Sequence, residues 1–307
     1  IPPMQLRRMG KSMRMAVYAS QKTIQKAGNP KIDAVITGTG EGCLRDSEKF
    51  VEAMWDNDGA MLNPTPFIQS THNMAAATVA LALGCKGYNM TYTNNANSFE
   101  SAVLDAILYL NENPEHQILI GGLDEISEKT MEFWNSAGYV NLENPKIPID
   151  INSKSTGEVN AEGAGFFLAS ANKPENYLGV ISAVETKFEV QNTEEFIQNF
   201  LEKNRIQIEE IDAVILGYNG DSRYDGIYET VSKGIFKDKP QMIYKNIFGE
   251  FDTATALAIE TGFKVLEHQK IPEILKLNNL ERDAYQNILV YNQRRGNNHS
   301  LIFLSKE

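Results

Sequence analysis

The sequence predicts an α/β fold made of two similar halves, because one strand-like segment occurs twice and buried strands alternate with amphipathic helices. Residues 32–38 and 211–217 match at six of seven positions. Each segment has a polar residue near its start, continues as the apolar run of a buried parallel strand, and enters a glycine-rich turn. Strands that alternate with helical patterns in this way predict βαβ units and mostly parallel sheets.

The order of elements also recurs, since a long amphipathic helix followed by two strands closes each half. The first set covers residues 98–111, 117–121 and 163–170, and the second covers residues 253–268, 287–291 and 298–305. An internal repeat of this kind indicates gene duplication. We therefore expect an N-terminal half at residues 1–175 and a C-terminal half at residues 176–307.

Each glycine-rich turn leads into a predicted helix, at residues 47–55 in the first half and 224–236 in the second. A further helix is predicted at residues 71–83, and a strand at 88–93. The region of about residues 125–156 has weak periodicity and contains Pro145 and Pro148. Its composition favours a long insertion that covers a site or a partner rather than a domain boundary.

The charge of the chain limits its partners. The 307 residues carry a net charge of −11, and 42% of them are apolar, which is enough for a large core. We expect neither a nucleic acid nor an anionic membrane as a partner. The basic segment at residues 6–14 is the exception, and we interpret it as the solvated start of a helix. No apolar run approaches the ~20 residues of a membrane span.

Cys43 and Cys85 are the two cysteines of the chain, and they lack the spacing of a metal-binding pair. They predict a reducing, cytoplasmic location, no metal and two structural thiols, although a helix start near Cys43 could lower the pKa of its thiol. The glycine-rich turn at residues 38–42 is too short for a phosphate loop and lacks its lysine. We therefore expect no cofactor.

A polar turn at residues 93–98 lies between the predicted strand at 88–93 and the helix at 98–111. A nucleophile is often placed at such a turn, because the positive end of the helix stabilises its ionised form. The turn reads Thr-Asn-Asn-Ala-Asn-Ser and contains no cysteine. It has the setting of a catalytic turn without a nucleophile.

Several motifs over nearly the whole chain resemble those of the thiolase-fold β-ketoacyl synthases. They are Asn73-Met74 in a helix, Gly87 before a strand, and the segments 155–165, 245–249 and 296–303. The resemblance implies two duplicated βαβ halves in a layered α-β-α-β-α arrangement. The first strand of that family has no counterpart in the sequence.

The resemblance also implies which positions would carry catalysis. The family condenses acyl thioesters with a cysteine nucleophile and two histidines that stabilise negative charge on the thioester oxygen. The cysteine position falls at Ala96, between Asn95 and Asn97. The first histidine position falls at Gly217 or Asn219, and the second falls at Glu250. The histidines of the chain are His72, His116, His268 and His299, so none can fill either position.

Two other residues mark the expected pocket. Lys245 is retained from the family pattern, whereas Arg294 stands where the family has a gating aromatic residue. Together with Asn97, they are our candidates for residues that line a substrate pocket.

A ketosynthase frame without its three catalytic side chains resembles a chain-length factor, the non-condensing subunit that pairs with an active ketosynthase in fatty-acid or polyketide-type biosynthesis. Two alternatives remain open. Asn95, Asn97 or Asn219 could bind a thioester oxygen in an enzyme of changed chemistry, such as a decarboxylase. The chain could also be a homodimeric scaffold or acyl-binding module.

The resemblance places a dimer interface on the predicted helix at 71–83 and the strand at 88–93. The interface candidates are His72, Asn73, Met74, Tyr88, Met90 and Tyr92. Acyl carrier proteins are generally acidic, so a subunit with a net charge of −11 should repel them. We therefore expect contact with a carrier protein to be indirect, through a basic active partner.

Overall fold

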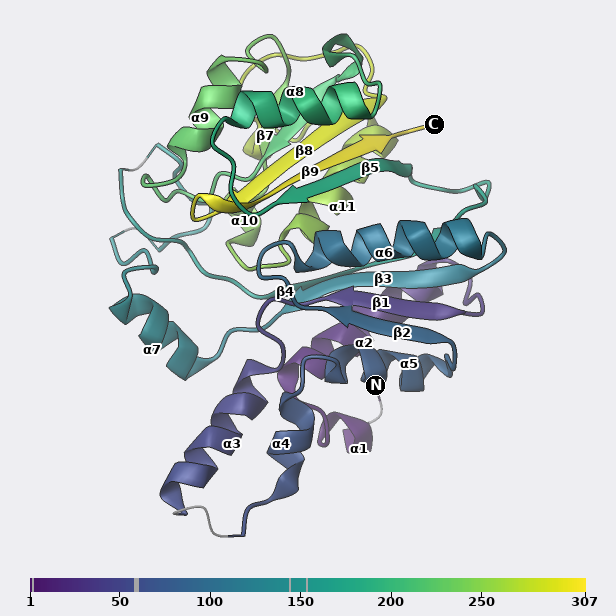
Figure 1. Ribbon diagram of the computed structural model, residues 1–307, viewed down its shortest axis with the longest axis vertical. Coiled ribbons are helices and arrows are strands. Elements are labelled where there is room, and N and C mark those ends of the chain that lie inside the picture. Colours follow the sequence, from purple (N-terminus) through teal and green to yellow (C-terminus); the bar gives the residue numbers. More distant parts are fainter. Residues whose placement is uncertain (2, 58–60, 144, 153) are drawn as a thin grey trace. The chain divides into compact units, whose positions relative to one another are not determined.

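The computed structural model describes residues 1–307 apart from residues 2, 58–60, 144 and 153 (Figure 1). The chain divides into two compact units, each of which is described by itself. Unit 1 contains residues 1–137, 161–173 and 251–256, and unit 2 contains residues 138–160, 174–250 and 257–307. The division into halves at residues 1–175 and 176–307 remains a prediction. The same holds for the layered α-β-α-β-α arrangement of these halves.

Unit 1 contains a four-stranded sheet of order β2-β1-β3-β4. Its strands are β1 (Ala34–Gly38), β2 (Tyr88–Tyr92), β3 (Gln117–Asp124) and β4 (Gly163–Ser170). β1 pairs in parallel with β2 and β3, whereas β3 and β4 are antiparallel. Every residue of β1 is buried, as its apolar sequence predicts for a central parallel strand.

The helices of unit 1 cover both faces of this sheet, with α2 and α5 on one face and α6 on the other (Figure 1). Side chains such as Val17, Val79 and Leu119 form one core cluster between α2, α5 and the sheet. The helices are α1 (Pro3–Leu6), α2 (Lys11–Lys26), α3 (Leu44–Asp56), α4 (Pro64–Ser70), α5 (Met74–Leu83), α6 (Ser98–Glu112) and α7 (Glu128–Ser136). α3 and α4 pack against each other through Phe50 and Phe67, whose ring centroids are 5.1 Å apart.

Unit 2 contains a five-stranded sheet of order β5-β9-β8-β6-β7. Its strands are β5 (Val180–Lys187), β6 (Ala213–Leu216), β7 (Gln241–Ile243), β8 (Asn287–Arg294) and β9 (Asn297–Ser305). β6 pairs in parallel with β7 and β8, and β9 is antiparallel to both β8 and β5. The repeated segments therefore form β1 and β6, and each lies between two parallel neighbours.

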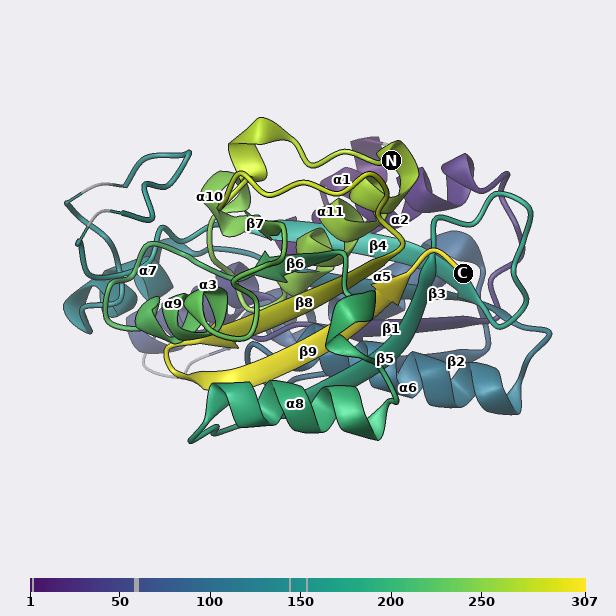
Figure 2. The same cartoon turned by 90° about the horizontal axis from the view of Figure 1, so that it is seen from above.

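Figures 1 and 2 show α8 and α11 on opposite faces of the sheet of unit 2. Phe196 and Phe200 of α8 join Tyr228 of α9 and Tyr291 of β8 in one buried cluster. The helices are α8 (Thr193–Lys203), α9 (Gly226–Lys233), α10 (Lys245–Phe248) and α11 (Thr255–His268), whose first two residues belong to unit 1, with short 3-10 turns η1 (Ile208–Glu210) and η2 (Glu273–Leu275).

The predicted strands and long helices are present, but three features differ from expectation. The region 125–156 contains the helix α7, β5 was not predicted, and two of the four pairings in unit 2 are antiparallel. β9 runs antiparallel to β8 because a tight turn joins these two strands. Among the described residues, unit 1 has no strand that corresponds to β5.

No helix in the described ranges combines the length and apolar character that a membrane span requires.

Candidate functional site

The turn at the predicted nucleophile position lies between β2 and α6 in unit 1. Asn95 is exposed and has a φ of 46°, a left-handed conformation that asparagine tolerates better than most residues. The Ser98 hydroxyl accepts a hydrogen bond from the Asn94 amide at 2.8 Å and donates one to the Asn95 carbonyl at 2.6 Å. Serine at the start of α6 therefore stabilises the turn without any catalytic group.

Ala96 occupies the cysteine position, and 1% of its surface is exposed. Asn97 is also buried, and its Oδ1 has no hydrogen-bond partner within the described part of the chain. Gly38, at the end of β1, lies against this turn, since a Cβ there would be 2.3 Å from the Ser98 carbonyl oxygen. The strand and helix are packed closely around a position that carries only a methyl group.

In unit 2, the two candidates for the first histidine position have different surroundings. A Cβ at Gly217 would lie 2.3 Å from Asn292 Oδ1 and 2.6 Å from the Tyr228 hydroxyl. No side chain fits there without displacing both groups. Asn219 has a buried side chain, and its Nδ2 donates a hydrogen bond to Glu250 Oε2 at 2.8 Å.

Glu250 also forms an ion pair with Lys245, whose Nζ is 2.7 Å from the same Oε2. The side chains of Lys245 and Glu250 are 0% and 1% exposed. Lys245 begins the short helix α10, and Gly249, with a φ of 72°, reverses the chain so that Glu250 folds back onto Lys245. Asn219, Lys245 and Glu250 thus form one buried polar network, which we call the Lys–Glu–Asn network.

Asp225 fixes the loop that carries Asn219. Its carboxylate accepts hydrogen bonds from the backbone amides of Asn219 at 3.3 Å and Gly220 at 2.8 Å. Burial raises the pKa of Asp225 to about 7, although these amides and the charge of Lys245 oppose the shift. Asp225 is the N-cap residue of α9, but its carboxylate bonds to the loop amides and makes no capping bond to the helix.

A second buried ionic cluster in unit 2 surrounds Glu158. Arg295 donates two hydrogen bonds to its carboxylate at 3.1 and 2.9 Å, and Arg294 Nη2 lies 3.3 Å from Glu158 Oε2. The Arg295 guanidinium also lies 3.8 Å from the centroid of the Tyr139 ring. Burial raises the pKa of Glu158, but the charges of Arg294 and Arg295 outweigh that effect and hold the pKa below its usual range. The turn between β8 and β9, where the gating aromatic was expected, is therefore anchored by ion pairs.

The three pocket candidates thus lie in different settings. Asn97 is in unit 1, whereas Lys245 and Arg294 are in unit 2, where each pairs with a buried carboxylate. Sequence reasoning missed Glu158 and the loop-fixing role of Asp225. Glu158 lies in the motif segment 155–165, but nothing in the spacing linked it to Arg294.

The predicted interface residues lie at the edge of the sheet of unit 1. β2 pairs with β1 alone among the described strands, so its outer edge offers backbone groups to another strand. Tyr88, Met90 and Tyr92 belong to β2 and are all partly or fully exposed. His72 and Asn73 are exposed just before α5, which begins at Met74.

The two cysteines have different surroundings. Cys43 is buried, and burial together with Glu125 and Asp46 raises the pKa of its thiol to about 12, so it is a poor nucleophile. Cys85 is partly exposed. In the part of the chain that the structure describes, no three His, Cys, Asp or Glu side chains are close enough to hold a metal ion.

Comparison with known proteins gives the fold. Residues 1–141 match the family model described as beta-ketoacyl synthase, N-terminal domain. No curated protein matches the chain in sequence. A beta-ketoacyl synthase from Burkholderia phymatum STM815 has a similar structure, with a TM-score of 0.79 and 15% identity over 100% of this chain and 85% of that chain.

Two similar structures contain chain length factors. The ishigamide ketosynthase/chain length factor has a TM-score of 0.80 and 17% identity over 100% of this chain and 84% of that chain. The ketosynthase ApeO in complex with its chain length factor ApeC from Xenorhabdus doucetiae gives a TM-score of 0.76, with 17% identity and coverage of 100% and 84%. The chain therefore has the mixed α/β fold of the ketosynthases, and its first 141 residues match the N-terminal domain of the β-ketoacyl synthase family.

Proposed function

We propose that this chain is a non-condensing, ketosynthase-like subunit that supports an active β-ketoacyl synthase in fatty-acid or polyketide-type biosynthesis. The observation that carries the proposal is the buried Lys–Glu–Asn network, because two of its members, Asn219 and Glu250, are at positions where the resemblance predicts histidines. The absence of a nucleophile at Ala96 agrees with it.

Condensation needs a nucleophile and donors that stabilise developing negative charge. The carboxylate of Glu250 would repel an enolate, and the Lys245 ammonium that could offset it is bonded to that carboxylate. Alanine and asparagine at 95–97 cannot form a thioester. The residues at these predicted positions therefore supply neither the nucleophile nor free donors for the developing charge.

The decarboxylase alternative is weakened for Asn219, because its Nδ2 already donates to Glu250. Asn95 and Asn97 stay as the other candidate donors. The homodimeric scaffold differs from our proposal only in the partner, so it becomes an outcome of the test.

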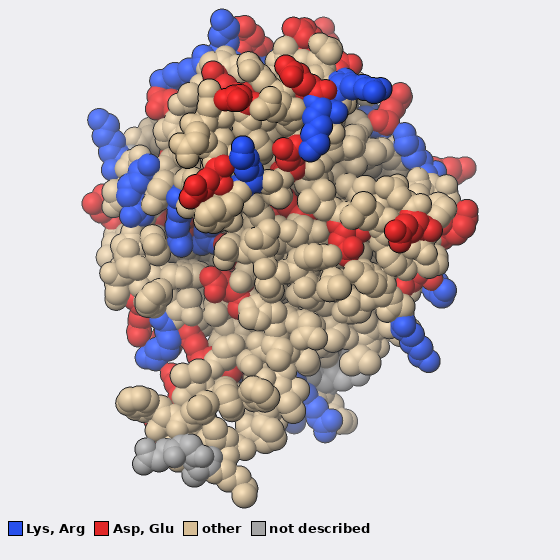
Figure 3. Space-filling model, in the orientation of Figure 1, with Lys and Arg blue, Asp and Glu red and all other residues tan. Residues whose placement is uncertain are grey.

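Unit 1 offers a surface for the partner. The outer edge of β2 is unpaired among the described strands, and the pair α3–α4 exposes a patch of large apolar side chains. Trp55 is 86% exposed and Met61 fully so, with Phe67 and Ile68 also exposed. Apart from the residues drawn in grey, few charged side chains are seen at the lower end of the molecule in Figure 3, where α3 and α4 lie. Exposed apolar surface of this kind is typical of an obligate interface of roughly 2,000 Å² or more.

Co-expression with candidate ketosynthases, followed by native mass spectrometry, tests the proposal. We expect a one-to-one heterodimer that Met90→Lys on β2 weakens by at least tenfold. Leu280→Lys, a substitution at an exposed apolar residue of unit 2, is the matched control and should leave pairing intact. A homodimer that ignores every ketosynthase would favour the scaffold, and a clean monomer at micromolar concentration would contradict both. A cytoplasmic location for the complex is part of the proposal.

A further inference from the structure

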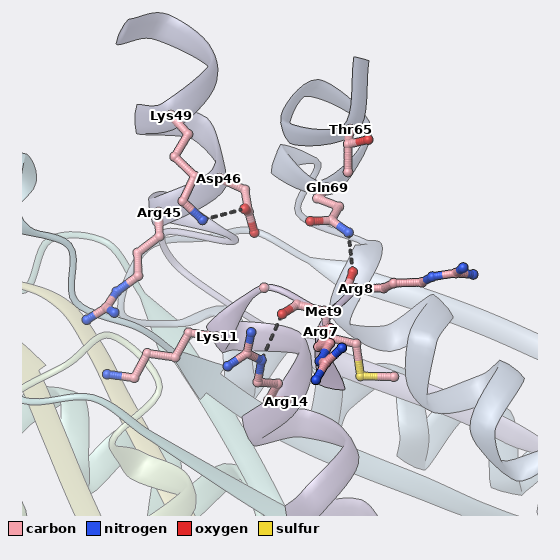
Figure 4. A pocket seen from close by; sticks show the side chains of 11 residues that line it. Arg7, Arg8, Met9, Lys11, Arg14, Arg45, Asp46, Lys49, Thr65 and Gln69 are labelled. Carbon is pink, nitrogen blue, oxygen red and sulfur yellow. Dashed lines mark hydrogen bonds and ion pairs between the residues drawn. The ribbon is translucent and has the colours of Figure 1, made fainter. Parts of the chain in front are cut away.

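Unit 1 contains a basic cavity of about 590 Å³ next to the start of α2 (Figure 4). Six of the 29 Lys and Arg residues of the chain line it: Arg7, Arg8, Lys11, Arg14, Arg45 and Lys49. We call this the basic cavity. It stands out because the chain as a whole carries a net charge of −11.

The walls of the basic cavity come from segments that are distant in sequence. Residues 7–14 form one wall, and the other comes from α3 and α4. Gln69 of α4 joins the walls, because its Nε2 donates to the Arg8 carbonyl at 2.5 Å, as Figure 4 shows. The charges are therefore gathered by the fold, and the sequence interpretation of a solvated helix start covers only one wall.

Three of the six cations, Arg7, Arg8 and Arg14, form no ion pair with any carboxylate in the described ranges, and Arg14 instead donates to the Met9 carbonyl at 2.8 Å. Arg45 donates to the Ile126 carbonyl at 2.9 Å, and its charge acts on the carboxylates of Glu125 and Glu162. Guanidinium groups stay protonated at any physiological pH. The cavity therefore holds a permanent positive charge.

The remaining charges of the lining are paired. Lys11 binds Glu162, and Lys49 lies 3.2 Å from Oδ1 of Asp46, the one carboxylate of the lining. Asp46 is buried, and its Oδ2 packs against Gly10, where a Cβ would be 2.0 Å away. Asp46 therefore neutralises Lys49 and leaves the arginine charges in excess.

We propose that the basic cavity binds a phosphate or diphosphate group of a small ligand. Arginine presents paired N–H donors that match phosphate oxygens, and the cavity has the size of a small-molecule site. An acidic protein would instead contact a flat or convex basic surface, whereas these side chains line a hollow. The proposal goes beyond the partner role and does not depend on it.

Isothermal titration calorimetry of the full chain with inorganic pyrophosphate, in about 50 mM salt, tests the proposal. We expect saturable binding that the double variant Arg7→Gln/Arg14→Gln weakens at least tenfold. The control Lys22→Gln/Lys26→Gln removes two exposed cations from the same helix, outside the cavity, and should change affinity less than twofold. Circular dichroism confirms that both variants fold.

Two outcomes would overturn the proposal. Equal weakening in both double variants would mean that pyrophosphate responds to net charge alone. Absence of saturable binding, together with binding of an apo-acyl carrier protein that Arg7→Gln/Arg14→Gln abolishes, would assign the surface to an acidic protein instead. Neither outcome depends on whether the chain pairs with a ketosynthase.

Discussion

The polar turn at residues 93–97 in unit 1 and the Lys–Glu–Asn network in unit 2 differ in what their buried side chains require. At the turn, a small buried alanine lies at the predicted nucleophile position, and the Ser98 hydroxyl makes the hydrogen bonds to the backbone. In unit 2, Asn219 and Glu250 lie at predicted histidine positions, and Glu250 forms a buried ion pair with Lys245. Ala96 needs no polar partner, whereas each member of the network does.

This difference has energetic consequences. The methyl group of Ala96 needs neither a hydrogen-bond partner nor a counter-ion. A buried ion pair requires both partners, because either charge alone would lie in a poorly hydrated site. Substitutions in the network should therefore affect folding strongly, whereas those at the turn should affect it weakly.

The largest effect is expected for Lys245→Met. Glu250 would keep its hydrogen bond from Asn219 but lose its counter-ion, so the free energy of unfolding should fall by about 3–5 kcal/mol. Urea denaturation measures the change. Lys245→Met/Glu250→Gln should recover at least half of the loss, because the amide needs no counter-ion. A loss below about 1 kcal/mol in the single variant would remove the distinction between the two regions.

A smaller effect is expected from the pH dependence of Asp225. Its pKa is raised from 3.8 to about 7 in the folded chain, so the folded state binds this proton more tightly than the unfolded state. The contribution of Asp225 to stability therefore falls as pH rises from about 4 to about 7 and is constant above that range.

Asp225→Asn should remove this dependence. Its stability relative to the natural chain should rise by on the order of 2 kcal/mol between pH 4 and pH 8, as measured by urea denaturation at each pH. Asp283→Asn changes an exposed carboxyl group of the same unit and serves as the control. Parallel pH profiles for Asp225→Asn and the natural chain would show that the loop does not hold a buried, protonatable carboxyl.

Ala96→Cys should cost roughly 1 kcal/mol, because it adds one heavy atom at a tightly packed position. A cysteine at the turn would then cost little stability, whereas the substitution in the Lys–Glu–Asn network would cost much more. Thermal unfolding gives the stability, and a thiol reagent reports access to the new cysteine. A loss as large as that of Lys245→Met would mean that the turn has also been repacked around alanine.

The smallest gain is expected in condensation activity: the triple variant Ala96→Cys/Asn219→His/Glu250→His should show none above background in an assay with malonyl- and acyl-loaded carrier proteins. Catalytic groups need positioning to about half an ångström by their neighbours. Arg294 would stay in the place of the gating aromatic, and Lys245 would lose Glu250. A rate close to that of an intact ketosynthase would show that the network is incidental.

The sequence predicted the elements that local patterns determine. The repeat at residues 32–38 and 211–217 identified β1 and β6, and the helical periodicity identified α6 and α11. β5 was missed because residues 180–187 mix polar and apolar side chains, as an edge strand does. α7 was missed because none of its residues is buried, so it has no clear apolar face.

The candidate site was predictable only by position. Motif spacing pointed to Gly217 or Asn219 and to Glu250 as histidine positions, but it did not show that Glu250 bonds to both Asn219 and Lys245. The choice between Gly217 and Asn219 depends on Asn292 and Tyr228, which come from other elements. Such long-range contacts leave no periodic signal in a single sequence.

The most direct test of the non-condensing role is intact-mass spectrometry of the purified chain after incubation with an acyl-loaded carrier protein. An intact ketosynthase should gain one acyl group under the same conditions, and Cys85→Ser controls for adventitious transfer to the partly exposed thiol. We predict no acyl adduct on this chain, because Ala96 and its neighbours offer no nucleophile. A stable adduct on any residue other than Cys43 or Cys85 would contradict the proposal that the chain is a non-condensing subunit.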